Sequence, residues 1–303
     1  MYEHDHHSDD NRSGPALRNA LLLTLSFAAV EFVVGWWGGS LALMADAGHM
    51  LTDSTALGLA ALAAWYAQRP ADAQHSWGHG RGEIIAAIVN GMAMLILIGV
   101  IVSNAIERFS NPVEIRGAAV LLVAVIGLIV NLLVLRVLHG GQDNINVKGA
   151  MLHVLGDLLG SIAAITSGLV IVLSGWTPID PILSLVICTL ILFAAVSLLK
   201  TGFGVVMEGV PAGIELEEVR KAMQQIDGVV GIHDLHIWQI SSARTALSAH
   251  VVIHDLNAWP GILERLNAML LQDFQIDHPT LQAEPDGESG CRHAGSDDPQ
   301  CVG

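Results

Sequence analysis

The sequence predicts an α-helical membrane protein with six transmembrane helices, followed by a small α+β domain. Three observations support this fold class. The 303 residues are 52% hydrophobic and only 14% charged, with a mean hydropathy of +0.53, so the chain is too apolar for an ordinary soluble domain. Six apolar stretches each approach the ~20 residues that a helix needs to cross a bilayer. Beyond Lys200 the composition becomes that of a soluble protein.

The six apolar stretches are expected to form a transmembrane domain over residues 16–206. They run over residues 16–38, 42–67, 84–107, 117–138, 149–174 and 179–199. The acidic, His-bearing tail at residues 1–15 leads into the first stretch without a small-residue cleavage site, so we expect the first helix to remain in the mature chain.

Basic residues near the ends of the stretches predict the orientation. Seven of them fall on one side of the membrane: Arg12, Arg18, Arg69, Arg81, Arg136, Lys148 and Lys200. The opposite side has only Arg108 and Arg116. Because Lys and Arg near span ends are enriched in the cytoplasm, both termini are predicted to be cytoplasmic, in a multi-pass protein of the inner membrane. The formal net charge of −15 does not conflict with this rule, which counts basic residues and not net charge.

Residues 207–284 are predicted to form a small cytoplasmic domain with the order αββαβ. A helix is expected near 214–226, strands near 229–240 and 245–254, a second helix near 259–272 and a short strand near 279–284. This order suggests a ferredoxin-like sandwich, with both helices on one face of a three-stranded sheet. The opposite face is a candidate dimer contact, because a domain of this size has a thin core. We expect disorder over residues 285–303.

The three cysteines indicate a reducing location. Cys188 lies within the sixth stretch, and Cys291 and Cys301 lie in the C-terminal tail, so no disulfide framework is evident. A metal site built on the tail cysteines is the weaker interpretation of that pair.

Two motifs of the same design lie in separate apolar stretches. They are His49-Met-Leu-Thr-Asp53 and His153-Val-Leu-Gly-Asp157. Residues four apart lie on one helix face, so each motif presents an imidazole and a carboxylate that point the same way. If the two faces meet, two nitrogens and two oxygens form a tetrahedral site for a zinc-like ion.

The apolar stretches also contain other polar residues. They are Glu31, Asp46, Asn90, Asn104 and Asn131. An ionised carboxylate in the middle of a membrane costs ~3 kcal/mol, so such residues usually line a pathway and have a partner. For one motif alone, a hydrogen bond between helices is an equally good explanation, whereas two matched motifs favour a functional site. Small residues near the motifs permit the two helices to approach closely: Ala45, Gly48, Gly156 and Gly160.

Four longer motifs follow one another along the chain. They are Ser40-Leu-Ala-Leu-Met-Ala-Asp-Ala-Gly-His-Met-Leu-Thr-Asp53, the loop from Arg69-Pro-Ala-Asp72 to His75-Ser-Trp-Gly-His-Gly-Arg-Gly-Glu83, Asn146-Val-Lys-Gly-Ala-Met-Leu-His-Val-Leu-Gly-Asp157, and His233-Asp-Leu-His-Ile-Trp238. Together they resemble the cation diffusion facilitator family of zinc transporters, over nearly the whole chain.

The resemblance implies a homodimeric exporter that moves a divalent metal out of the cytoplasm in exchange for protons. It assigns the transport site to His49, Asp53, His153 and Asp157, and histidine at position 49 points to Zn²⁺. Cd²⁺, Co²⁺ and Ni²⁺ are further candidate ions, with no nucleic-acid partner expected. Two carboxylates and two neutral imidazoles balance the charge of a dication, and protons would replace the metal when it leaves.

The resemblance also points to two cytoplasmic sites. Asp72, His75 and His79 match a second metal site of some members, although a solvated loop with turns at Gly78 and Gly80 is an equal alternative. His233, His250 and Glu284 match ligands of a regulatory ion at the dimer interface. We predict a single Zn²⁺ there, held by some combination of these residues with His278. The alternative is that these histidines are ordinary core or interface residues.

Other classes of protein fit less well. An intramembrane metalloprotease would carry His-Glu-x-x-His and an ATP-driven pump a phosphate-binding loop, and the sequence contains neither, so we expect a transporter and not an enzyme. A membrane metal sensor or a passive divalent-cation channel remains an alternative, because ligands alone do not demonstrate exchange.

Overall fold

The computed structural model describes residues 10–67, 69, 72–139, 145–241 and 244–286, without the side chains of 10–21, 57, 60, 64, 67, 137–139 and 145–153. The chain divides into two compact units, residues 1–59 with 89–198 and residues 60–88 with 199–303. The predictions for the start of the N-terminal tail and for the C-terminal tail from residue 287, with Cys291 and Cys301, lie outside the described residues.

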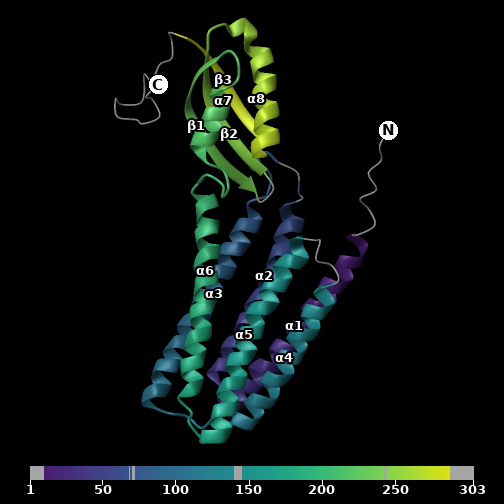
Figure 1. Ribbon diagram of the computed structural model, residues 1–303, viewed down its shortest axis with the longest axis vertical. Coiled ribbons are helices and arrows are strands. Elements are labelled where there is room, and N and C mark those ends of the chain that lie inside the picture. Colours follow the sequence, from purple (N-terminus) through teal and green to yellow (C-terminus); the bar gives the residue numbers. More distant parts are fainter. Residues whose placement is uncertain (1–9, 68, 70–71, 140–144, 242–243, 287–303) are drawn as a thin grey trace. The chain divides into compact units, whose positions relative to one another are not determined.

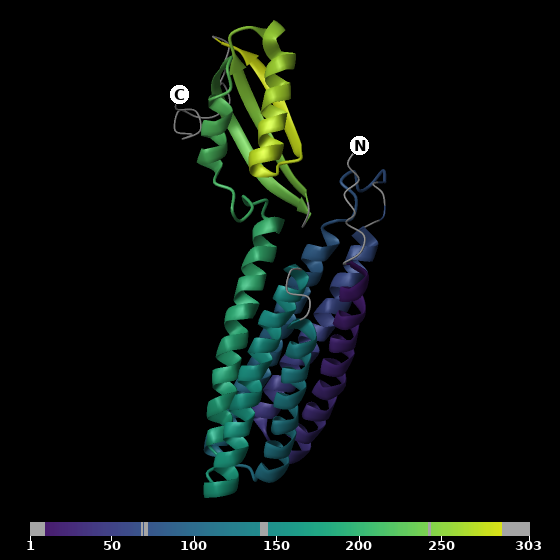
Figure 2. The same ribbon diagram turned by 45° about the vertical axis from the view of Figure 1, so that its right-hand side comes forward.

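Six long helices occupy the stretches that the sequence assigns to the membrane (Figure 1, Figure 2). They are α1 (Asp10–Gly38), α2 (Leu41–Ala67), α3 (Gly82–Ser110), α4 (Gly117–His139), α5 (Ile145–Ser174) and α6 (Ile179–Val206). Four stretches are long and apolar enough to cross a membrane, namely Gly82–Ser110, Gly117–Arg136, Val154–Ser174 and Ile179–Val206. The described part of α1 adds a shorter apolar stretch, Leu22–Gly38. The hydropathy of α2 is lowered by Asp46, His49 and Asp53, which belong to the run from Ser40 to Asp53.

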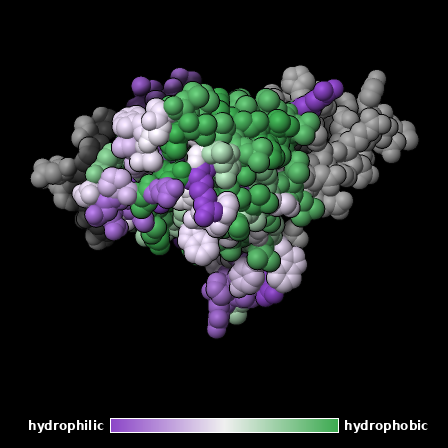
Figure 3. All heavy atoms as spheres, turned by 90° about the horizontal axis from the view of Figure 1, so that it is seen from below, coloured by the Kyte–Doolittle hydropathy of each residue, from purple (hydrophilic) through white to green (hydrophobic). Residues whose placement is uncertain are grey.

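Large apolar side chains cover the outside of the helical unit. Ile96, Leu122, Leu173 and Phe193 are between 62% and 76% exposed. Figure 3 shows hydrophobic residues over most of the coloured surface, with hydrophilic residues gathered in a few clusters. Apolar exposure on this scale is typical of a surface that faces lipid or another protein. Together with the long helices, it confirms the prediction of a helical membrane protein.

Two apolar clusters hold the helices together. The first joins α2, α3 and α6 and includes Leu41, Ala45, Met94, Ile98 and Ile191. The second joins α1, α2, α4 and α5 and includes Phe27, Met50, Val123, Ala124 and Ala164. Helix α2 contributes to both clusters, so its position is fixed from two sides.

A buried carboxylate connects four helices near the turn between α1 and α2. Asp180, at the start of α6, is 0% exposed and accepts hydrogen bonds from Ser40 Oγ and from the backbone N–H of Leu41, both at 2.6 Å. Ser167 Oγ of α5 donates to it at 3.0 Å, and Arg108 Nη1 of α3 lies 3.6 Å away. The carboxylate thus caps the first turn of α2 and fixes the ends of α2, α3, α5 and α6 relative to one another.

The C-terminal domain has the predicted order of helices and strands. It contains α7 (Leu216–Gln224), β1 (Val229–Ser241), β2 (Arg244–Ile253), the short 3₁₀ helix η1 (Leu256–Ala258), α8 (Trp259–Phe274) and β3 (His278–Pro285). Strand β2 is central, antiparallel to β1 and parallel to β3. Alternate residues of β2 share one core with both helices, which places α7 and α8 on the same face of the sheet: Leu247, Ala249, Val251, Met223 and Leu266.

Candidate metal sites

The two His/Asp motifs lie on α2 and α5, which run in opposite directions and approach closely (Figure 1). Gly160 of α5 faces Asp46 of α2, since a Cβ atom at Gly160 would lie 2.6 Å from Asp46 Cγ. The motif His49–Asp53 begins three residues after Asp46, and the motif His153–Asp157 ends three residues before Gly160. Because both helices rise about 1.5 Å per residue, this register brings the two motifs to the same level of the bundle.

The side chains of the motifs are buried to different degrees. His49 Nδ1 and Asp53 Oδ2 are 3.4 Å apart, and their side chains are 16% and 14% exposed. Asp157 is 1% exposed. His153 lies in α5, but its side chain is outside the described part of the chain. The structure therefore pairs the two motif residues of α2 and buries one motif residue of α5 at the same level.

The predicted close approach of the two helices is confirmed at one of the glycines. Gly160 makes the approach to Asp46, whereas a Cβ atom at Gly156 would meet nothing within 4 Å. Gly48 lies against a third helix, since a Cβ atom there would be 2.8 Å from Leu97 Cδ1 of α3. The small residues thus serve two different helix contacts.

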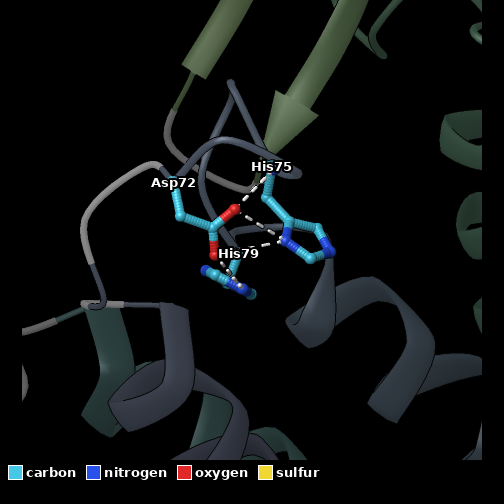
Figure 4. Close-up of side chains that lie close together, drawn as sticks. All are labelled: Asp72, His75 and His79. Carbon is cyan, nitrogen blue, oxygen red and sulfur yellow. Dashed lines mark hydrogen bonds and ion pairs between the residues drawn. The ribbon is translucent and has the colours of Figure 1, made fainter.

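The loop between α2 and α3 brings its three predicted ligands together (Figure 4). His75 Nδ1 lies 3.1 Å from Asp72 Oδ1, and His79 Nε2 lies 3.9 Å from Asp72 Oδ2. One ligand atom from each residue falls within 4.8 Å of the others. Ligand atoms around tetrahedral zinc are about 3.4 Å apart, so a small rearrangement would suffice to hold an ion.

Backbone N–H groups hold the Asp72 carboxylate in an orientation that suits a metal ligand. It accepts hydrogen bonds from the N–H groups of Gln74 at 2.8 Å and His75 at 2.7 Å. These bonds, followed by the His75 side chain, hold the pKa of Asp72 below its usual value. The carboxylate is therefore ionised at neutral pH, as a metal ligand requires. His79 is also fixed in place, because its ring packs edge-on against Tyr66, with centroids 4.6 Å apart.

The sheet of the C-terminal domain brings together three of its four predicted ligands. His233 of β1 is paired directly with His250 of β2. Glu284 of β3 lies between them, with Oε2 at 3.0 Å from His233 Nε2 and Oε1 at 2.7 Å from His250 Nδ1. Burial alone would raise the pKa of Glu284, but hydrogen bonds and charge interactions with the two histidines outweigh it, so the pKa lies below its usual value.

The fourth predicted ligand of this domain lies elsewhere. His278 begins β3, six residues before Glu284, and a strand of that length spans about 20 Å. Its ring instead meets Trp77 edge-on, with centroids 4.9 Å apart. Asp234, which the sequence did not single out, supplies a ligand atom within 4.8 Å of those of His233 and His250. Its position could not be foreseen, because it depends on a left-handed backbone at Asp234, with φ of 51°.

Comparisons with known proteins agree with this arrangement. The profile of the cation efflux transmembrane domain matches residues 17–207, and that of the cation efflux protein cytoplasmic domain matches residues 211–286. A cation efflux transmembrane domain followed by a cytoplasmic domain defines a class of membrane ion transporter. The chain belongs to the cation efflux family, which confirms the resemblance seen in the sequence.

Individual relatives are similar along most of their length. Zinc transporter ZitB of Yersinia pestis is 42% identical over 268 residues, covering 88% of this chain and 86% of that protein. The cadmium, cobalt and zinc/H(+)-K(+) antiporter of Bacillus subtilis is 35% identical over 292 residues, covering 94% and 93%. A solved structure, the metal-bound C-terminal domain of the CzcD transporter from Cupriavidus metallidurans, is 39% identical over 23% of this chain and 99% of that one, with a TM-score of 0.23.

Proposed function

We propose that this protein exports Zn²⁺ from the cytoplasm in exchange for protons. The observation that carries the proposal is that the motifs His49–Asp53 and His153–Asp157 lie at the same height on two antiparallel helices. The contact between Asp46 and Gly160 sets this height. Two imidazoles and two carboxylates form a ligand set that suits Zn²⁺. The relatives named as a zinc transporter and as a cadmium, cobalt and zinc/H(+)-K(+) antiporter support the same substrate class.

Charge balance links metal to protons. A dication with two carboxylates and two neutral imidazoles has no net charge, so it is tolerated in a medium of low dielectric constant. Without the metal, the carboxylates would be left charged and poorly hydrated, and proton uptake by the same side chains removes that cost. Metal and protons therefore compete for one site, and a bundle that opens it alternately to each side exchanges them.

The remaining parts of the proposal concern orientation and assembly. The distribution of Lys and Arg supports a protein of the inner membrane with both termini in the cytoplasm. The second profile, which matches residues 211–286, is that of a dimerisation domain, and this supports a homodimer. In this arrangement the Asp72 loop and the His233, His250 and Glu284 cluster both face the cytoplasm, where they bind Zn²⁺ as a regulatory ion and report its concentration.

The test is zinc flux in proteoliposomes that contain the purified protein. We expect zinc uptake to saturate with concentration, to rise when the vesicle interior is made acidic, and to be accompanied by proton exit. Zinc binding without flux would favour a membrane metal sensor. Flux that neither saturates nor responds to the pH gradient would favour a passive channel.

A further inference from the structure

One buried carboxyl group of the helical unit has no part in the proposed transport site. Glu31 of α1 is 0% exposed, and neither Oε1 nor Oε2 has a hydrogen-bond partner among the described residues. A carboxylate in this position would lose its hydration and gain no compensating bond. The side chain is therefore stable there only as the neutral acid or beside a bound cation.

The helix that faces Glu31 leaves room for this carboxyl group. A Cβ atom at Gly127 of α4 would lie 2.7 Å from Glu31 Oε1 and 2.7 Å from Phe27 Cε1. Asp46 of α2 is accommodated in the same way by Gly160, is 1% exposed, and has an Oδ2 atom without a partner among the described residues. Two buried acids thus each pack against a glycine, at a place where any larger side chain would collide with the carboxyl group.

Two other acids act on Glu31 among the described residues. Glu31 is within electrostatic range of Asp46 on α2 and Asp157 on α5, and the three carboxylates repel one another when ionised. Helix α4, which also packs against α1, has no titratable side chain between Gly117 and Leu135. The proton affinity of Glu31 therefore depends on the charge held by the neighbouring transport site.

We propose that Glu31 is a proton-binding site separate from the metal ligands and coupled to them by charge. When the ligands hold no metal, the Glu31 carboxyl keeps its proton. A dication that arrives beside Asp157 stabilises the ionised form, so the O–H bond breaks and H⁺ leaves toward the cytoplasm. After the metal has left on the other side, Glu31 takes a proton from that side. This step needs no reactant beyond the metal and H⁺, and it rests on the proposed exchange of metal for protons.

The experiment counts protons released for each Zn²⁺ bound by the purified full chain in weakly buffered detergent solution. Glu31→Gln keeps the shape of the side chain but cannot titrate. We expect this variant to bind Zn²⁺ and to release fewer protons than the wild type, by up to about one for each metal. Glu31→Asp, which can still titrate, is expected to restore part of the release. Glu107→Gln removes an exposed carboxylate of α3 and serves as the matched control, with release unchanged.

A second measurement on the wild type does not depend on the folding of a variant. Infrared difference spectra with isotope-labelled glutamate carboxyls should show the loss of a protonated-carboxyl C=O band when Zn²⁺ is added. Two results would overturn the proposal: no change in any glutamate band, or full proton release from folded Glu31→Gln. Loss of zinc binding in folded Glu31→Gln would also overturn it, because Glu31 would then act on the metal directly. If the wild type itself releases no protons, the proposed exchange fails as well, and the two failures are thus distinguished.

Discussion

Glu31 of the helical unit and Glu284 of the C-terminal domain are carboxyl groups in opposite situations. Glu284 has a histidine nitrogen on each oxygen, at 2.7 Å and 3.0 Å, and its side chain is 18% exposed. Glu31 is fully buried without any hydrogen bond among the described residues. The first carboxylate has its partners before any metal arrives, whereas the second needs an ion or a proton to be stable.

The difference explains how carboxylate side chains can serve two functions, the sensing of metal and the coupling of metal to protons. A carboxylate already held by histidines changes little when Zn²⁺ replaces their protons, which suits a site that reports metal concentration. Acids buried without cations change charge state whenever the metal arrives or leaves, which suits a site that couples two ions. Four predictions test this contrast, beginning with the largest expected effect.

Removal of a membrane ligand should abolish transport. Asp157→Asn leaves the volume of the side chain unchanged but removes a charge from the proposed site. We expect zinc flux in proteoliposomes to fall further than the ~10–100-fold that loss of a supporting residue costs. Glu107→Gln, with the same change of charge at an exposed position, should transport normally. Substantial flux by Asp157→Asn would place the metal elsewhere in the bundle.

The helix contact that sets the register should be sensitive to one methyl group. In Gly160→Ala, the new Cβ would lie 2.6 Å from Asp46 Cγ, so either the Asp46 carboxyl group must turn away or the two helices must separate. We expect a cost of about 1–3 kcal/mol, measured as a lower melting temperature in detergent, together with weaker zinc binding. Gly156→Ala, on the same helix with open space around it, is the matched control. Equal behaviour of the two variants would contradict the proposed register.

Loss of a ligand from the sheet should attenuate transport without abolishing it. His250→Ala leaves His233 and Glu284 in place, so we expect the full chain to bind less Zn²⁺ and to transport a few-fold more slowly. His254→Ala is the control, because His254 is exposed and pairs with Asp286 at 3.0 Å outside the cluster. A loss as complete as that of Asp157→Asn would remove the distinction between the transport site and the regulatory site.

The smallest effect concerns the pH dependence of the C-terminal domain. Because the folded pKa of Glu284 is below its ordinary value of 4.5, the carboxylate stabilises the fold at higher pH and loses this contribution as the pH falls through the folded pKa. We expect at most about 1 kcal/mol, because solvent screens the site. Hydrogen exchange of the β1 and β2 amides, corrected for its intrinsic pH dependence, should reveal this loss in the wild type. Glu284→Gln should lack it.

The sequence predicted the elements of this fold better than their contacts. The apolar stretches and the order αββαβ correspond to α1–α6 and to the C-terminal domain, because hydropathy and periodicity are local properties. Boundaries moved by a few residues, as for α3, which extends from Gly82 to Ser110 and not from 84 to 107. The parallel pairing of β3 with β2 had no local signal, since it depends on the path of α8 across the sheet.

In the candidate sites, too, local features were predicted better than contacts between residues distant in sequence. The His/Asp spacing identified the residues of each motif, and a small-residue pattern predicted where the helices approach. Neither indicated that Gly127 would face Glu31, or that Asp180 would meet donors from three other helices, because these partners are distant in sequence. His278 was grouped with His233 and His250 by strand proximity, but its position at the start of β3 separates it from them.

The junction at Asp180 has a genetic consequence. One acceptor serves several donors there, so substitutions of the acceptor and of the donors differ in their effect on the fold. A change at Ser40 or Ser167 removes one of the hydrogen bonds to this carboxylate and leaves the others to hold the helix ends. A change at Asp180 removes the acceptor of Ser40 Oγ, Ser167 Oγ and the Leu41 N–H at once, together with the ion pair to Arg108. A library of all single variants, selected for growth in toxic zinc, should therefore tolerate many residues at the two serines and almost none at the aspartate.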